Sequence, residues 1–164
     1  MGRMSRIEIR YNNGVFVVEK GSERYREGEA IEPLEVAYLL QEERAIVLDE
    51  SNRVLELKDL VMIYSSKREW WLLFTVLYDL HKRGRIARRG FGDRDLILER
   101  EGKKYQIYVT EENVFIPISI ILDWIESSMK KGFIPVIAVV DMYGDVTYYK
   151  ASKHSFRKIE REEI

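Results

Sequence analysis

The sequence predicts an α+β protein in which a small N-terminal α/β domain precedes a mixed-sheet domain with flanking helices. Strand-like segments occur in both halves of the chain, and segments with apolar residues at helical spacing separate them. Asn-Gly and isolated glycines mark turns between these segments. The length of 164 residues suffices for one ordinary domain or two small ones, and 46% hydrophobic residues permit a core.

The predicted N-terminal domain, residues 1–64, opens with a β-hairpin. Asn-Asn-Gly separates its two strands, and Asn-Gly supplies the positive φ angles that a tight turn needs. Pro33 then opens a helix, because proline is favoured in the first helical turn. The expected segments are strands at 6–11, 14–19 and 45–50 and helices at 33–44 and 57–64.

The predicted C-terminal domain, residues 65–164, opens with an amphipathic helix that Gly84 ends. The apolar residues of this helix recur at helical spacing and are Trp70, Leu73, Phe74, Leu77 and Leu80. The segments expected after it are strands at 85–89, 94–100 and 103–109, a helix at 117–131, and strands at 135–141 and 145–151. The final stretch, HSFRKIEREEI, is highly charged, so we expect it to fray.

The composition favours a globular protein that is neither secreted nor embedded in a membrane. No apolar run approaches the ~18 residues that span a bilayer, and the first residues lack the apolar segment of a signal peptide. The chain has no cysteine, so it forms no disulfides, and we expect a cytoplasmic protein. The charged fraction of 34% together with the lack of cysteine is typical of thermophiles.

The charge of the chain is unevenly distributed. The formal net charge is −1, yet residues 81–104 hold nine Lys/Arg and four acidic residues, a local charge of +5. This run favours contact with phosphates, and a solvated charged face explains it equally well. The candidate RNA-binding residues are Arg83, Arg85, Arg88 and Arg89.

No metal, cofactor or nucleotide motif is predicted. His81 and His154 are far apart and have no cysteine partners, so zinc spacing is absent. Gly84, Gly90 and Gly92 match no phosphate-binding pattern and are interpreted as turn glycines.

Asp93 and Asp95 lie two residues apart in an expected strand, which would put both on one side. Such a pair could serve as catalytic acids. With arginines beside them, we favour local ion pairs.

Three motifs together resemble the archaeal tRNA-splicing endonucleases. YDLHKRG (78–84) followed by GFGDRDLIL (90–98) is similar to two central motifs of that family. PVIAVVDMYGDVTYYKA (135–151) resembles its closing hairpin, and EPLEVAYLLQEERAIV (32–47) resembles part of its smaller leading domain. The resemblance extends over about residues 6–152 and implies an RNase-like C-terminal domain.

The resemblance also implies a metal-independent reaction that needs no cofactor. A tyrosine activates the 2′-hydroxyl for attack on the adjacent phosphate, a histidine protonates the departing 5′-oxygen and a lysine stabilises the charge. The products carry 2′,3′-cyclic phosphate and 5′-hydroxyl ends. In this chain the corresponding positions hold Leu98, Lys104 and Lys131, with Lys130 as the alternative for the third. Leucine cannot accept a proton, so the resemblance implies a chain without catalytic residues.

The implied role is that of the structural subunit in a two-chain enzyme, with two copies of each chain acting on precursor tRNA. By resemblance, the acidic loop of the closing hairpin inserts into a basic pocket of a neighbouring chain, and the strand after it pairs with the partner's last strand. The residues implied to bind the partner are Asp141, Tyr143, Gly144, Asp145, Val146 and Tyr148.

Two alternatives stay open at this point. The first is an active RNase that uses other residues, such as Tyr105 or Tyr108 with His81. The second is a stand-alone RNA-binding module of nuclease-like fold.

Overall fold

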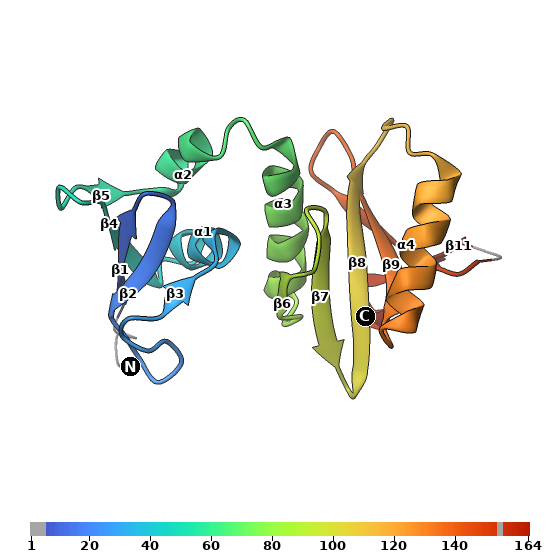
Figure 1. The fold of residues 1–164 in the computed structure, drawn as a ribbon, viewed down its shortest axis with the longest axis horizontal. Helices are drawn as coiled ribbons and strands as arrows, with labels where there is room; N and C mark the ends of the chain where they lie inside the picture. Colours follow the sequence, from blue (N-terminus) through green and yellow to red (C-terminus); the bar gives the residue numbers. More distant parts are fainter. Residues whose placement is uncertain (1–5, 154–155) are drawn as a thin grey trace. The chain divides into compact units, whose positions relative to one another are not determined.

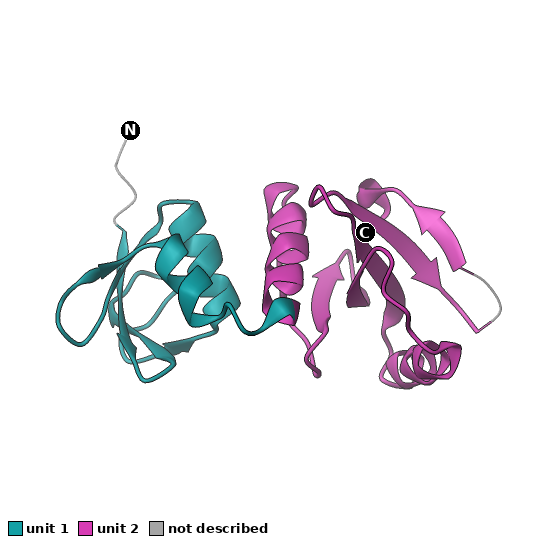
Figure 2. Ribbon diagram, turned by 90° about the horizontal axis from the view of Figure 1, so that it is seen from above, with its two compact units in different colours: residues 1–68 teal, residues 69–164 magenta. Residues whose placement is uncertain are grey.

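The structure, a computed structural model, describes residues 6–153 and 156–164 and divides into two compact units (Figure 2). Unit 1 is Met1–Arg68 and unit 2 is Glu69–Ile164, so the division lies just after the expected boundary at residue 64. Both units combine helices with a sheet, which confirms the predicted α+β class.

Unit 1 is a five-stranded sheet with two helices (Figure 1). The strand order is β3-β2-β1-β4-β5, with β1 and β4 parallel and the other neighbours antiparallel. The elements are β1 (Ile7–Asn12), β2 (Val15–Lys20), β3 (Ala30–Ile31), α1 (Pro33–Gln41), β4 (Ala45–Leu48), β5 (Val54–Leu55) and α2 (Leu57–Ile63).

The first hairpin of unit 1 has the predicted turn. Asn13 and Gly14 adopt φ angles of 48° and 85°, the left-handed values that this tight connection requires. Pro33 occupies the first turn of α1, as predicted. Buried side chains of the hairpin and of α1, such as Ile9 and Leu34, form the core of this unit.

Unit 2 is a six-stranded sheet in the order β11-β10-β9-β8-β7-β6 (Figure 1). Only β8 and β9 run parallel among the paired strands of this sheet that the structure describes. The elements are α3 (Arg68–Lys82), β6 (Ala87–Arg89), β7 (Asp95–Arg100), β8 (Lys103–Glu111), α4 (Ile118–Lys130), β9 (Ile134–Val140), β10 (Val146–Ala151), β11 (Phe156–Ile159) and a 3₁₀ turn (Arg161–Glu163).

Helices α3 and α4 cover opposite faces of this sheet. The Tyr148 hydroxyl donates a 2.7 Å hydrogen bond to Asp79 of α3, so this residue of β10 faces α3. The next residue, Tyr149, packs in the apolar cluster that contains Ile121 and Ile125 of α4. Successive residues of a strand point to opposite faces of the sheet. The strand register therefore shows which residues face α3 and which face α4.

The C-terminal stretch is ordered where the structure describes it, so the expectation of fraying is wrong for residues 156–164. β11 pairs antiparallel with β10, and Ile164 is only 1% exposed. Arg161 holds this segment in place, because it donates to Asp79 at 3.0 Å and to the main-chain oxygen of Val146 at 3.1 Å. His154 and Ser155 lie outside the described residues.

Candidate functional site

Leu98 and Lys104 belong to the hairpin of β7 and β8, and their side chains point to opposite faces of the sheet. Leu98 pairs with Tyr105 in register, and Glu99 pairs with Lys104. Leu98 and Tyr105 are buried on the α3 face. Lys104 is exposed and lies on the α4 face with Tyr108. The ring of Tyr108 packs against Trp124 of α4, with the ring centroids 5.3 Å apart. The two positions therefore do not form a joint site.

Lys131 follows the last residue of α4 and lies against the loop between β6 and β7. Its Nζ is 4.5 Å from the centroid of the Phe91 ring. Lys130 instead pairs with Glu126 at 3.5 Å on the helix surface. No described contact joins Lys131 to Leu98.

The C-terminal segment covers the α3 face near Leu98. The Tyr105 hydroxyl lies 3.5 Å from the main-chain oxygen of Glu163. The main-chain oxygen of Ile164 accepts hydrogen bonds from Arg85 at 2.5 Å and from Arg100 at 2.9 Å. The ring nitrogen Nε2 of His81 is 2.7 Å from the Ala87 oxygen. The alternative base and acid, Tyr105 and His81, thus both contact main-chain oxygens within this unit.

Asp93 and Asp95 do not form a pair, because β7 begins only at Asp95. The Asp93 side chain is exposed and lies 3.9 Å from Arg89, so the expected ion pair is confirmed there. Asp95 is only 3% exposed, and its carboxylate accepts hydrogen bonds from Phe91 N at 3.0 Å, Gly92 N at 2.6 Å and Gln106 Nε2 at 2.7 Å. The expected ion pair is wrong for Asp95, because its carboxylate oxygens accept hydrogen bonds from neighbouring amide groups.

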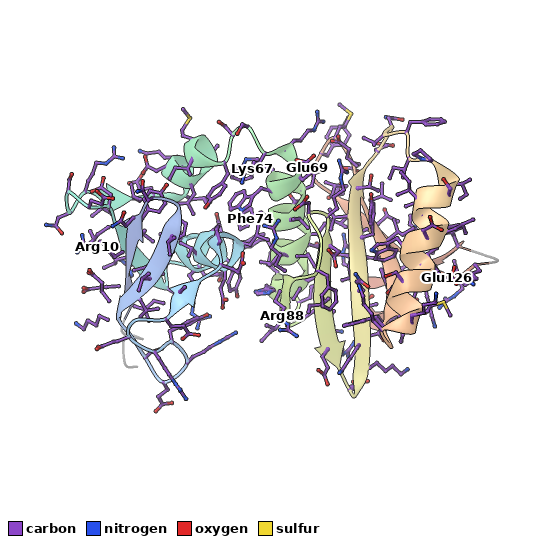
Figure 3. The ribbon with its side chains drawn as sticks, in the orientation of Figure 1. Arg10, Lys67, Glu69, Phe74, Arg88 and Glu126 are labelled. Carbon is purple, nitrogen blue, oxygen red and sulfur yellow. The ribbon has the colours of Figure 1, made fainter. Side chains whose placement is uncertain are left out.

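The four candidate RNA-binding arginines have different surroundings. Arg83 lies 3.9 Å from Asp79, Arg89 lies 3.9 Å from Asp93, and Arg85 binds main-chain oxygens of Ile164 and Arg83. Arg88, labelled on β6 in Figure 3, is exposed and makes no ion pair or side-chain hydrogen bond with the part of the chain that the structure describes. Of the four, Arg88 is the one most available to a ligand.

The turn between β9 and β10 has a rigid base and an exposed tip. Asp141 Oδ1 accepts hydrogen bonds from Tyr143 N at 2.8 Å and from Asp145 N at 2.9 Å, and Asp141 N donates to the Asp145 oxygen. Gly144 has a φ angle of 82°, which favours glycine. Met142 and Tyr143 at the tip are both 82% exposed. The turn therefore presents two large exposed side chains on a hydrogen-bonded backbone, beside two carboxylates.

Val146 and Tyr148, which the resemblance also implied to bind the partner, are not part of the exposed turn. Both side chains are buried on the α3 face, and burial followed by the hydrogen bond to Asp79 raises the pKa of the Tyr148 hydroxyl above its usual range. β10 itself lies between β9 and β11, and β11 pairs with residues 148–151 of its outer edge. The expected pairing with a partner's strand therefore requires either the outer edge of β11 or the release of β11 from β10.

No group of three or more metal-ligating His, Cys, Asp or Glu side chains occurs among residues 6–153 and 156–164. Within the same ranges, no helix has the length and apolar character needed to cross a membrane.

Comparison with known proteins adds no family assignment. No protein-family model matches the chain, and no curated protein matches it.

Sequence reasoning missed the cluster formed by Asp95, Gln106 and the loop of residues 90–94. A signal for it exists in the sequence, since Gly90 and Gly92 shortly precede Asp95. A Cβ atom on Gly90 would lie 2.1 Å from Asp95 Oδ2, so the carboxylate occupies the space that a side chain at residue 90 would need. The partner Gln106 comes from the next strand, and no short-range pattern indicates it.

Proposed function

We propose that this chain is the structural, non-cleaving subunit of a tRNA-splicing endonuclease, which assembles with a catalytic subunit to cut introns from precursor tRNA. The order and spacing of the three motifs support this proposal. The observation that carries it is that Leu98 is buried on the α3 face while Lys104 lies on the α4 face. A general base must accept a proton, which the Leu98 side chain cannot do, so these two side chains do not supply the base and the acid of the reaction.

The turn of residues 141–145 is the proposed contact with the catalytic subunit. Its two carboxylates suit a basic pocket, and the exposed Tyr143 supplies an aromatic anchor of the kind enriched at interfaces. The proposed assembly contains two copies of each chain and holds two active sites at the separation that the precursor tRNA requires. Arg88 is the proposed contact of this chain with RNA phosphates.

Reconstitution tests the proposal. The purified chain is mixed with the catalytic subunit from the same cells, and cleavage of a bulge-helix-bulge RNA is measured at multiple turnover. We expect no cleavage by this chain alone, cleavage by the mixture, and co-elution of the two chains as an equimolar complex. Cleavage by this chain alone, after contaminating nuclease is removed, would contradict the proposal, as would failure of the two chains to associate.

The two alternatives make different predictions in the same experiment. An active RNase would cleave without a partner, and Tyr105→Phe with His81→Ala would abolish that cleavage. A stand-alone RNA-binding module would bind RNA with an affinity that falls steeply with salt, and no second chain would change it.

A further inference from the structure

A buried carboxylate fixes the loop between β6 and β7. Asp95 is 3% exposed and accepts two main-chain N–H groups of the loop and one amide N–H of Gln106. A charged group is costly to bury, and three hydrogen bonds offset that cost only when the loop keeps this one conformation. Gly90 is compatible with this conformation because it has no Cβ. The loop is thus held from its buried side.

The same loop exposes a large aromatic ring on its other side. Phe91 is 61% exposed although its own N–H is bonded to the buried Asp95. Its ring meets Phe133 edge-on, with centroids 5.7 Å apart and an interplanar angle of 73°. The Lys131 ammonium lies over one face of the Phe91 ring, 4.5 Å from the ring centroid, so a ligand would stack on the opposite face. We call Phe91, Phe133 and Lys131 the Phe91 platform.

Basic residues accompany the Phe91 platform on one face of the sheet. Arg88 is opposite Ile97 in register, and Lys104 is opposite Glu99. Leu98 faces α3, so its neighbours Ile97 and Glu99 face α4, and Arg88 and Lys104 lie on the α4 face with them. Helix α4 ends at Lys130, directly before Lys131 of the platform. Both side chains are exposed.

An exposed ring on a fixed backbone, beside cations, matches the chemistry of an unpaired nucleotide. Bases stack on aromatic side chains without regard to sequence, and nearby cations bind the phosphates. A paired base in a double helix offers no free face to such a ring, whereas a bulged or looped base does. A protein partner fits less well, because the cation beside the ring is Lys131 and lysine is depleted at protein interfaces.

We propose that the Phe91 platform binds single-stranded RNA by stacking one unpaired base on the Phe91 ring, with Arg88 contacting an adjacent phosphate. The choice of RNA rests on the proposed function, whereas the existence of a stacking site rests on the loop geometry. The role of Asp95 is to position Phe91 and not to touch the RNA.

Fluorescence titration of the isolated full-length chain tests this site directly. The probe is a short single-stranded RNA with one 2-aminopurine, whose emission changes when the base leaves its neighbouring bases and stacks on a side chain. Phe91→Ala should weaken binding roughly 5- to 100-fold and abolish the change in emission, because one stacked base is lost. Phe91→Trp should retain both. Arg88→Gln should lower affinity and reduce the dependence of the binding constant on salt by about one counterion.

Phe115→Ala is the matched control, since Phe115 is 96% exposed and lies beyond the far end of β8. It should bind the probe like the wild type, and a fully paired RNA should not distinguish Phe91→Ala from the wild type. Wild-type binding by Phe91→Ala, an equal loss in Phe115→Ala, or no binding of the probe by the wild type would overturn the inference. These outcomes are independent of splicing, because no catalytic chain is present. A chain that fails in reconstitution can still show Phe91-dependent binding. A chain that supports cleavage in reconstitution can also lack this binding.

Discussion

Asp95 and Tyr148 are two buried polar residues that determine local structure in unit 2. Asp95 organises the loop that carries Phe91, and Tyr148 joins β10 to α3 through Asp79. Asp79 also accepts a hydrogen bond from Arg161, so one carboxylate connects a helix, a strand and the C-terminal segment. Hydrogen bonds to charged groups contribute more than neutral ones, and leaving a buried group without its partner costs more still.

Gly90→Ala should destabilise unit 2 by about 1–3 kcal/mol, because the new Cβ would overlap a buried group that cannot move freely. The overlap is with Asp95 Oδ2 at 2.1 Å. Gly92→Ala is the control, since its Cβ would meet Asp95 Oδ1 at 3.2 Å and requires only a small shift. Denaturant unfolding measures both variants. Equal stability of Gly90→Ala and the wild type would show that the loop can be rearranged at little cost.

Tyr148→Phe should lower the free energy of unfolding by about 1.5–3 kcal/mol near neutral pH, because Asp79 loses a donor. The raised pKa of Tyr148 also has a pH consequence. The protonated phenol is the form that folding favours, so its contribution is complete below a pH of about 10 and is lost as pH rises further. The fall in stability above about pH 10 should therefore be shallower in Tyr148→Phe. If plots of the free energy of unfolding against pH run parallel for the two proteins from pH 8 to 12, this prediction is contradicted.

The elements of the fold differ in how far the sequence predicts them. The hairpin at Asn13-Gly14 and the helix ended by Gly84 follow from local signals, namely turn residues and helical spacing. β11 was missed because Arg157 and Lys158 give it the composition of a solvated tail, while its position depends on Asp79, far away in sequence. The opposite orientations of Leu98 and Lys104 likewise depend on the β7–β8 register, which a motif comparison does not contain.

Arg161→Ala should release β11 from β10. The substitution removes the hydrogen bonds to Asp79 and to the Val146 oxygen, at 3.0 and 3.1 Å. Amide hydrogens of residues 146–151 and 156–159 should then exchange faster, and the uncovered edge of β10 should promote self-association. Hydrogen exchange with mass spectrometry and sedimentation measure the two effects. Arg157→Ala is the control, because Arg157 is exposed and pairs only with Glu163 at 3.4 Å within the described residues. Equal exchange in the two variants would mean that β11 does not depend on Arg161.

At the scale of the whole molecule, unit 2 has different chemistry at the two ends of its sheet. β8 and β9 are parallel, so the segment after Glu111 and the turn after Val140 lie at one end, which carries Asp141, Asp145 and Tyr143. The other end carries mixed charge at the β7–β8 connection, where Glu99 and Glu101 accompany Arg100, Lys103 and Lys104. An acidic turn at one end favours oriented association with a basic surface of another chain. The turn of residues 141–145 is therefore the place to test assembly.

Asp141→Asn combined with Asp145→Asn separates the charge of this turn from its folding. Asparagine keeps an Oδ1 acceptor for the N–H groups of Tyr143 and Asp145, which donate to Asp141 at 2.8 and 2.9 Å, so the turn should be retained. The isolated double variant should therefore unfold like the wild type. In the proposed assembly it should lose about 2–5 kcal/mol of association energy, because the basic groups of the partner are left unpaired. Mass measurement of the reconstituted complex should then show a half-complex without cleavage activity. Tyr143→Ala is the companion variant, which removes the exposed ring and keeps both charges. A full assembly with normal cleavage in both variants would show that this turn only connects β9 to β10.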